Sequence, residues 1–311
     1  TPGNTTVATP KQVGDLAWQK ALEAMRSRGL RLTIGDLEDP EFDNTIAVRT
    51  MHVHEVCTLR EPFDVVFLVC KSYDTRWLVQ LIEPHLRADG VVVSVQNSLN
   101  EEWIAPIVGS ARVVGCTLTA GGELLEAGHA WRNRRLSILY YTIGELSGEL
   151  SPRIQALATI LSKAGKTAVT TNIRGAKWSK LVTNCASAAL SGLVDPRRRE
   201  WDLVEVPEWQ QASVRLYQEG VAVGRALGYR MEPLFGMTAD QLLEDPDAII
   251  QAMMVAKRVG ASKGATNMIQ QDLRKGRPTE VVGYFNGLMV RKGREAGMPT
   301  PMNEAMTALY V

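Results

Sequence analysis

Phe63–Cys70 reads FDVVFLVC, an almost continuous apolar run that is followed directly by Lys71. A short run that is apolar at both odd and even positions is typical of a parallel strand that is buried on both faces. A helical pattern comes next at 75–86, and Val91–Val95 (VVVSV) then gives a second buried strand. This order of strand, helix and strand predicts a doubly wound, mostly parallel α/β sheet.

The segments on either side continue the same alternation. Upstream, 5–8 has the pattern of a short strand, and 15–28 has helical spacing. Ser98-Leu99-Asn100-Glu101 matches a capping box, which predicts a helix that begins there. Downstream, the pattern predicts a helix at 151–163 and three strands, at 113–117, 136–143 and 168–171. We expect the strand at 136–143 to be antiparallel.

After Gly175 the strand patterns stop and helical spacing takes over. The sequence predicts five helices there, at 177–193, 209–227, 247–259, 265–273 and 280–296. We therefore divide the chain at about 172. Residues 1–172 are expected to form an incomplete dinucleotide-binding domain, and residues 173–311 an all-helical domain for substrate binding or dimerisation.

The glycine-rich loop of a dinucleotide-binding domain is missing from this sequence. Such a domain normally opens with a strand and a Gly-x-Gly-x-x-Gly turn, whose backbone approaches a pyrophosphate at a helix N-terminus. If Thr5–Ala8 is the second strand of a Rossmann-type sheet, the first strand and the loop lie upstream of Thr1. The loop after that second strand has no acidic residue for a ribose hydroxyl, and its Lys11 is placed to face a 2′-phosphate. Lys11 thus fits NADP as the cofactor only weakly, because an exposed loop lysine is the simpler interpretation of this residue.

Composition excludes several classes of protein. The 311 residues carry 35 basic and 34 acidic side chains, so the net charge of +1 gives no nucleic-acid or membrane-surface footprint. No apolar stretch reaches the ~20 residues of a membrane span. The four cysteines have neither metal-ligand nor redox spacing, which favours a reducing, cytoplasmic location. His52 and His54 have no third ligand nearby in the sequence, so we expect no metal site.

Polar residues that follow the predicted strands are candidates for a ligand site. Lys71 and Asn97 each end a predicted strand at its carboxyl edge, where ligands bind in open α/β sheets. Lysine in this position also reaches water simply because its stem is long.

Lys180 and Asn184 are four residues apart and share a helix face, where desolvation can lower the pKa of a lysine and make it a proton donor. Glu280 begins a predicted helix. It either has a role in the site or stabilises the helix by its interaction with the positive end of the helix dipole.

Several segments, in order and spacing, resemble the ketopantoate reductase (2-dehydropantoate 2-reductase) family. They are Val69–Asp74 (VCKSYD), Ser94–Ser98 (SVQNS), Lys177–Asn184 (KWSKLVTN), Gly276–Glu280 (GRPTE), Tyr284–Gly287 (YFNG) and Gly297–Asn303 (GMPTPMN). The resemblance covers nearly the whole chain.

The resemblance implies an oxidoreductase of pantothenate biosynthesis that reduces ketopantoate, or a related small 2-oxo acid, with NADPH. It places Lys71 and Asn97 near the nicotinamide ribose and the substrate. It makes Lys180, rather than Lys177 one turn earlier, the donor of a proton to the ketone oxygen. It also gives Glu280 a role in orienting the substrate or that lysine, and Asn184 a role in binding the substrate.

This sequence departs from the family pattern at two further places. Ser98 replaces the usual glycine after Gln-Asn, which puts a side chain near the substrate. Where the family has a substrate-binding serine, the chain has Met268 or, in another alignment, Asn267, and methionine cannot donate that hydrogen bond. These departures leave two alternatives open. One is a reductase for an imine or opine-like substrate, and the other is a truncated, non-catalytic binding or oligomerising chain. Met253 and Met254 fit either a homodimer interface or core packing.

Overall fold

The two apolar runs become neighbouring parallel strands of a five-stranded sheet with the order β11-β10-β7-β6-β5. Its strands are β5 (Phe63–Leu68), β6 (Leu86–Ser94), β7 (Val113–Leu118), β10 (Leu139–Glu145) and β11 (Lys166–Val169). The computed structural model describes residues 6–8, 16–119, 121–133, 139–194, 203–234, 236–259 and 266–311. All neighbouring strands of this sheet are parallel except β10 and β7. The mostly parallel sheet and its antiparallel strand are confirmed.

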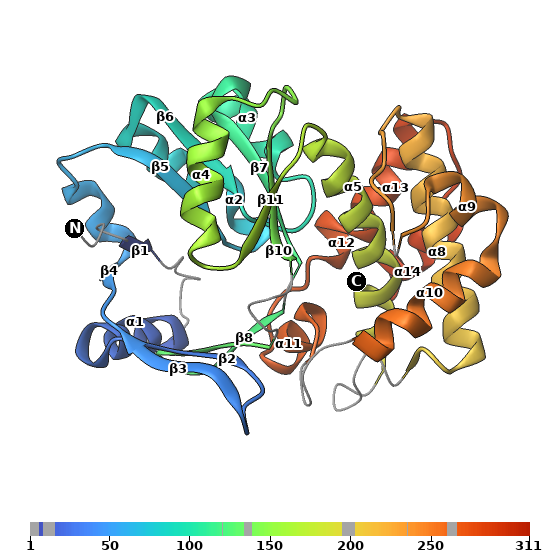
Figure 1. The fold of residues 1–311 in the computed structure, drawn as a ribbon, viewed down its shortest axis with the longest axis horizontal. Coiled ribbons are helices and arrows are strands. Elements are labelled where there is room, and N and C mark those ends of the chain that lie inside the picture. Colours follow the sequence, from blue (N-terminus) through green and yellow to red (C-terminus); the bar gives the residue numbers. More distant parts are fainter. Residues whose placement is uncertain are drawn as a thin grey trace.

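Helices cover both faces of this sheet (Figure 1). They are α2 (Thr75–Ile82), α3 (Glu101–Val108) and α4 (Pro152–Ser162). Val91, Val93 and Val95 pack on the α4 side, whereas Val92 packs with residues of α2 and α3. The alternation explains why the whole VVVSV run is apolar or small.

Strand β5 is less buried than its apolar run predicts. It is the last strand of the sheet, and of its residues only Leu68 is fully buried. Val65 and Phe67 pack on one face and Val66 on the other, so both faces are covered. The partial exposure follows from the strand's position at the edge.

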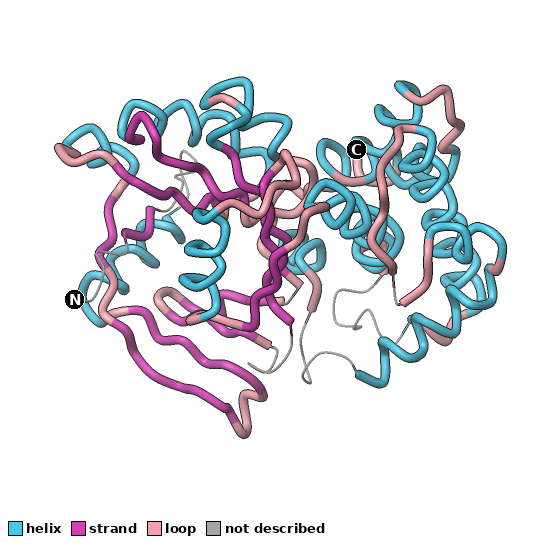
Figure 2. Tube along the Cα trace, turned by 45° about the horizontal axis from the view of Figure 1, so that its top comes forward, coloured by secondary structure: helices cyan, strands magenta, loops and turns pink. Residues whose placement is uncertain are grey.

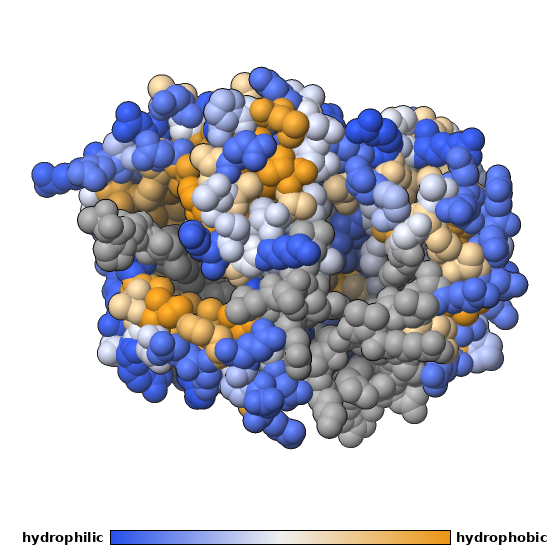
Figure 3. All heavy atoms as spheres, viewed as in Figure 1, coloured by the Kyte–Doolittle hydropathy of each residue, from blue (hydrophilic) through white to orange (hydrophobic). Residues whose placement is uncertain are grey.

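The first half also contains two smaller sheets. The strand predicted at 5–8 is present, but it belongs to a two-stranded sheet and not to the five-stranded one. Strands β1 (Thr6–Ala8) and β4 (Arg49–Met51) pair in parallel. A four-stranded sheet has the order β3-β2-β9-β8, with helix α1 (Leu16–Arg28) before it in the chain. Its strands are β2 (Leu30–Gly35), β3 (Pro40–Ile46), β8 (Gly122–Glu126) and β9 (His129–Arg132). In Figure 3 apolar residues show near α4 and on the lobe that holds α1.

The second half is helical, as predicted (Figure 2). Its helical elements are α5 (Ile173–Thr183), a π-helical segment (Asn184–Ala188), α6 (Ala189–Ser191), α8 (Pro207–Ala226), α9 (Ala239–Glu244), α10 (Pro246–Val259), α11 (Met268–Arg274), α12 (Val281–Tyr284), α13 (Asn286–Glu295) and α14 (Pro301–Ala308). The single helix predicted at 280–296 is broken at Phe285, whose φ and ψ are −115° and −100°. Among the residues described, no helix has the length and apolar character that crossing a membrane requires.

Two glycines in the sheet allow helix α5 to pack closely against it. Gly115 of β7 and Gly144 of β10 are direct partners in the ladder. A Cβ atom on Gly115 would lie 2.6 Å from the Cγ1 atom of Ile173, and one on Gly144 would lie 2.5 Å from the carbonyl oxygen of Thr170. Since only glycine leaves this space, the pair sets how closely the first turn of α5 approaches the sheet.

Candidate active site

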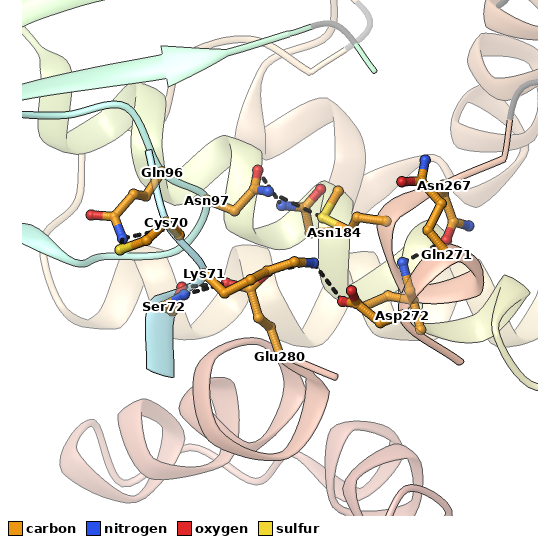
Figure 4. A network of polar contacts seen from close by, with 12 residues as sticks. Cys70, Lys71, Ser72, Gln96, Asn97, Asn184, Asn267, Gln271, Asp272 and Glu280 are labelled. Carbon is orange, nitrogen blue, oxygen red and sulfur yellow. Dashed lines mark hydrogen bonds and ion pairs between the residues drawn. The ribbon is translucent and has the colours of Figure 1, made fainter. Parts of the chain in front are cut away.

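A cluster of charged side chains joins the carboxyl end of β5 to the helical half (Figure 4). The Lys71 ammonium group forms an ion pair with Asp272 of α11, and it lies 3.5 Å from the Oε2 atom of Glu280. Both carboxylates are almost fully buried, whereas the Lys71 side chain is 29% exposed. The two buried carboxylates share one partly accessible ammonium group, which can still donate to a polar ligand.

Glu280 is held by Ser72 as well as by Lys71. Its Oε1 atom accepts hydrogen bonds from the backbone N–H of Ser72, at 2.9 Å, and from the Ser72 hydroxyl. The side chain of Glu280 caps no N–H group of α12, although the residue occupies the N-cap position. The contacts of Glu280 are therefore with Lys71 and Ser72, and they favour a role in the site over stabilisation of the helix N-terminus.

A buried hydrogen-bond chain continues from Ser72 behind the strand ends. Asn100 Nδ2 donates to the Ser72 hydroxyl at 3.0 Å, and the Thr75 hydroxyl donates to Asn100 Oδ1 at 2.9 Å. Gln96 Nε2 donates to Thr75 Oγ1 at 2.8 Å and to the carbonyl oxygen of Cys70 at 3.0 Å. These bonds connect the residues after β5 with those after β6, so the two strand ends are fixed relative to each other.

Asn97 and Asn184, both predicted from the sequence, meet across the boundary between the two halves. Asn184 Nδ2 donates to Asn97 Oδ1 at 3.2 Å, and Asn97 Nδ2 donates to the sulfur atom of Met268 at 3.1 Å. Asn184 is the first residue of the π-helical segment. Wide turns of this kind occur often at functional sites.

The two lysines of α5 have different surroundings. Lys180 is half-buried and lies one turn before Asn184, so the two residues share a helix face. Lys177 is only 3% exposed, and its ammonium group lies 2.8 Å from the Oε1 atom of Glu101. It also donates to the carbonyl oxygen of Gln96 at 2.7 Å. Lys177 is therefore a buried, paired residue.

Ser98 does not open a helix, so the predicted capping box is wrong. Helix α3 begins at Glu101, its N-cap residue is Asn100, and that side chain makes no capping bond. Ser98 has a φ of 67°, and its hydroxyl donates to the carbonyl oxygen of Tyr284 at 2.6 Å. The serine keeps the left-handed backbone that glycine adopts easily, and it links β6 to α12.

The structure gives Asn267 a structural task. Its Oδ1 atom accepts from the backbone N–H groups of Ile269 and Gln270, both at 3.0 Å, and so caps helix α11. Its Nδ2 atom lies 3.5 Å from the carbonyl oxygen of Ala188, to which it donates. Lys11, the other candidate for a ligand contact, lies outside the residues that the structure describes.

Burial changes the acid–base properties of this region. It raises the pKa of Asp272 above its ordinary value, while the charge of Lys71 acts in the opposite direction. It also raises the pKa of the Cys70 thiol to about 12, so this cysteine is protonated at neutral pH. In the described ranges, His, Cys, Asp and Glu side chains form no group of three that could hold a metal ion.

Sequence reasoning missed Ser72, Asn100 and Asp272 as parts of the site. Asp272 had a detectable signal, because it follows Ile269 by three residues on a helix and so shares its buried face. Ser72 and Asn100 had none, because small polar residues after strands are usually turn residues.

Two family models match the chain. The one described as "Ketopantoate reductase PanE/ApbA" matches residues 11–148, and the one described as "Ketopantoate reductase PanE/ApbA C terminal" matches residues 172–310. A protein of Archaeoglobus fulgidus called 2-dehydropantoate 2-reductase is 27% identical over 299 residues, which are 93% of this chain and 85% of that protein.

Solved structures share the fold at low sequence identity. A ternary structure of D-mandelate dehydrogenase with NADH and anilino(oxo)acetate has a TM-score of 0.79 and 16% identity, and the match covers 99% of this chain and 90% of that one. A dimeric ketopantoate reductase from Staphylococcus aureus has a TM-score of 0.68 and 16% identity, with 98% of this chain and 96% of that one covered. At these identities the likeness shows the fold alone.

Proposed function

Because the chain belongs to the ketopantoate reductase PanE/ApbA family of NAD(P)H-dependent 2-oxo acid reductases, we propose that it reduces a small 2-oxo acid to the 2-hydroxy acid. The observation that carries the proposal is the meeting of Asn97 and Asn184 beside the Lys71–Glu280 pair. These four side chains come from both halves of the chain and gather at the carboxyl ends of β5 and β6. That edge is where open α/β sheets bind their ligands.

Lys180 is the proposed proton donor. The reduced nicotinamide, when bound, supplies a hydride to the carbonyl carbon. The ammonium group of Lys180 then gives a proton to the carbonyl oxygen, so the ketone becomes an alcohol and the lysine becomes neutral. Before that transfer, its positive charge stabilises the developing alkoxide. Asn97 and Asn184 supply amide groups that hold and orient the substrate.

Lys71 and Glu280 have a supporting part in this proposal. Glu280 orients the substrate or Lys180, and its own orientation is supported by the two hydrogen bonds from Ser72. Lys71 is 29% exposed, so its ammonium group can donate a hydrogen bond to a ligand while it stays paired with Asp272 and Glu280. A carboxylate oxygen of a 2-oxo acid can accept such a bond.

The residues present fit the nicotinamide end of the cofactor better than its pyrophosphate end. Amide and ammonium groups of Asn97 and Lys71 are suitable donors for the nicotinamide ribose. The 311 residues contain no Gly-x-Gly-x-x-Gly turn for the pyrophosphate. We therefore propose that this stretch alone binds either dinucleotide weakly, and that the full-length protein prefers NADPH to NADH. Lys11 supplies charge for the 2′-phosphate in this proposal.

A titration with both cofactors tests the preference. Full-length protein should bind NADPH more tightly than NADH, and a Lys11→Ala variant should lose affinity for NADPH alone. Equal or reversed affinities would refute the preference.

Ketopantoate is the first substrate to test, and the departures at Ser98 and Met268 make related 2-oxo acids the next. D-mandelate dehydrogenase, solved with anilino(oxo)acetate, is a reason to include 2-oxo acids with aromatic side chains. The assay follows the oxidation of NADPH by its absorbance at about 340 nm. If full-length protein binds NADPH but reduces none of these acids, and instead reduces imines or amino-acid conjugates, the proposal is wrong. If it binds no cofactor, a binding or oligomerising role replaces it.

We further propose a homodimer in the cytoplasm, with domains at 1–172 and 173–311. The dimeric reductase of Staphylococcus aureus supports the first point, and the four free cysteines support the second. The domain division is supported by β11, which ends at Val169, and by α5, which begins at Ile173. Light scattering on the full-length protein measures the oligomeric state directly.

A further inference from the structure

The ion pair between Lys177 and Glu101 lies beneath the candidate active site and is not explained by the proposed reaction. The two side chains are 3% and 9% exposed, and they connect helix α5 with helix α3. Taking two charges out of water costs free energy, which the pair regains only with good geometry and further hydrogen bonds. The partners of Lys177 therefore indicate the role of the pair.

The Lys177 ammonium group binds the turn after β6 and strand β7. Besides Glu101, it donates to the carbonyl oxygen of Gln96 at 2.7 Å and to that of Cys116 in β7 at 3.4 Å. The Gln96 carbonyl belongs to the peptide bond that leads into Asn97. Because Lys177 precedes Lys180 by three residues on α5, one ammonium group connects the helix of the proposed proton donor to the peptide that orients Asn97.

We propose that Lys177 is a positioning residue for the proposed reduction, and that Glu101 fixes the rotamer in which Lys177 reaches this turn and strand β7. The pair sets the distance between helix α5 and the turn that carries Asn97. It thereby aligns the amide that holds the substrate with the lysine that protonates it. This inference rests on the proposed function, and it assigns Lys177 no contact with the substrate.

A second ion pair provides a matched control. Lys292 of α13 lies 3.2 Å from the Oε2 atom of Glu102, the residue next to Glu101 on α3. Its side chain is 14% exposed, and it also pairs with Glu295 within its own helix. Both pairs thus join α3 to a helix of the second half, but the contacts of Lys292 are with these two carboxylates and not with a strand end.

The decisive variants are Lys177→Met and Lys292→Met in the full-length protein. Methionine keeps most of the length of lysine and removes the charge and the donors. Lys177 also lines a cavity of about 120 Å³ with Glu101, Ile173 and Tyr229, so the side chain at this position has room to adjust. We expect Lys177→Met to lower kcat on the order of 10- to 100-fold, because small misplacements of reacting groups have effects of that size.

The same comparison separates positioning from mere stabilisation. Lys292→Met should leave kcat unchanged at a temperature where both variants are fully folded, even if both have a lower Tm. Lys177→Arg, which retains charge and donors, should recover part of the lost kcat. If Lys177→Met and Lys292→Met have the same kcat, or if Lys177→Met equals the wild type, Lys177 has only a structural role and the inference is wrong.

A measurement without turnover distinguishes this inference from the proposed function. Amide hydrogen exchange across residues 96–100 should be faster in Lys177→Met than in the wild type, and unchanged in Lys292→Met. Unchanged exchange in both variants overturns the inference, whereas a wild type that reduces no 2-oxo acid overturns only the proposed function. If Lys177→Met does not fold, Glu101→Gln is the second variant. It keeps an acceptor for Lys177, and by the same argument it must accelerate exchange across 96–100 and lower kcat.

Discussion

The Oε1 atom of Glu280 accepts both the backbone N–H and the hydroxyl of Ser72, although 208 positions separate the two residues in the chain. Ser72 lies in the turn after β5, and Glu280 precedes α12, so this contact joins the α/β half to the helical half. Both residues are 2% exposed. One carboxylate therefore contributes to the junction of the halves and to the charge at the site.

Glu280→Gln tests the role of this carboxylate. The amide oxygen can keep both bonds from Ser72, but it no longer offers Lys71 a negative charge. We expect kcat of the full-length protein to fall roughly 10²-fold, within the range of a lost orienting group in general acid–base catalysis. Combined with Lys180→Ala, the effects should be non-additive, since the two residues act on one proton transfer. An additive double variant would show that they act independently, and the exposed Glu304→Gln serves as the control.

Lys180→Ala tests the proton donor. A positioned donor contributes roughly 10²- to 10⁴-fold, so kcat should fall by about this factor while NADPH affinity changes little. Steady-state kinetics and a cofactor titration measure the two quantities. Lys177 cannot serve as the control because it is buried and paired, whereas Lys163, at the exposed end of α4, can. Near-normal kcat in Lys180→Ala would end the proposed mechanism.

Asp272 should give stability a specific pH dependence. Burial raises the pKa of this carboxyl above its usual 3.8, so the folded protein binds its proton more tightly than the unfolded chain does. The contribution of this carboxyl favours folding at low pH and is lost as the pH rises from 3.8 through the folded-state pKa. Asparagine has no such titration. The free energy of unfolding of the wild type minus that of Asp272→Asn should therefore decrease from about pH 4 to about pH 7.

Urea unfolding followed by tryptophan fluorescence at several pH values measures this difference. A difference that increases with pH would mean that the Lys71 charge, and not burial, determines the pKa of Asp272.

Substitutions of Ser98 should change the free energy of unfolding through two opposing effects, a lost hydrogen bond and relieved backbone strain. Ser98→Ala removes the hydrogen bond to the part-buried carbonyl of Tyr284 and keeps a side chain at a φ of 67°, so it should cost about 1–3 kcal/mol. Ser98→Gly loses the same bond but relieves roughly 1 kcal/mol of left-handed strain. Chemical denaturation should therefore rank the wild type first, glycine second and alanine last. Alanine above glycine would mean that the backbone at this position is not strained.

Apolar patterning was enough to predict the main sheet, because buried strands need apolar residues on both faces. It located Val91–Val95 and the antiparallel β10, and the positions of Lys71 and Asn97 followed from the strand ends. It did not find β3, because five of the seven residues of Pro40–Ile46 are exposed and the strand has no apolar face to detect. Such a strand is stabilised by its pairing with β2, a contact that local sequence does not encode.

The polar and charged residues of the site were predictable only in part. Asn184 and Lys180 follow from a spacing of four on a helix, a local rule that held for Asn184, which contacts Asn97. The burial of Lys177 depends on Glu101 and on two carbonyl groups of the sheet, which only the tertiary fold brings together. Since charged residues are seldom fully buried, local sequence does not predict the burial of Lys177.

The π-helical segment at Asn184–Ala188 changes the direction in which the side chains of this continuous helix point. A π turn holds one residue more than an α turn, and that extra residue rotates the remainder of the helix by about 100°. Lys180 and Asn184 precede or begin this offset, while the carbonyl groups of Cys185 and Ala186 accept side-chain donors from Asn286 and Ser213 of the helical core. Deleting a single residue here would restore a regular α-helix, so that the parts before and after the segment would share the same faces. The same stretch of chain could then no longer direct Asn184 toward Asn97 and also present its later carbonyl groups to Asn286 and Ser213.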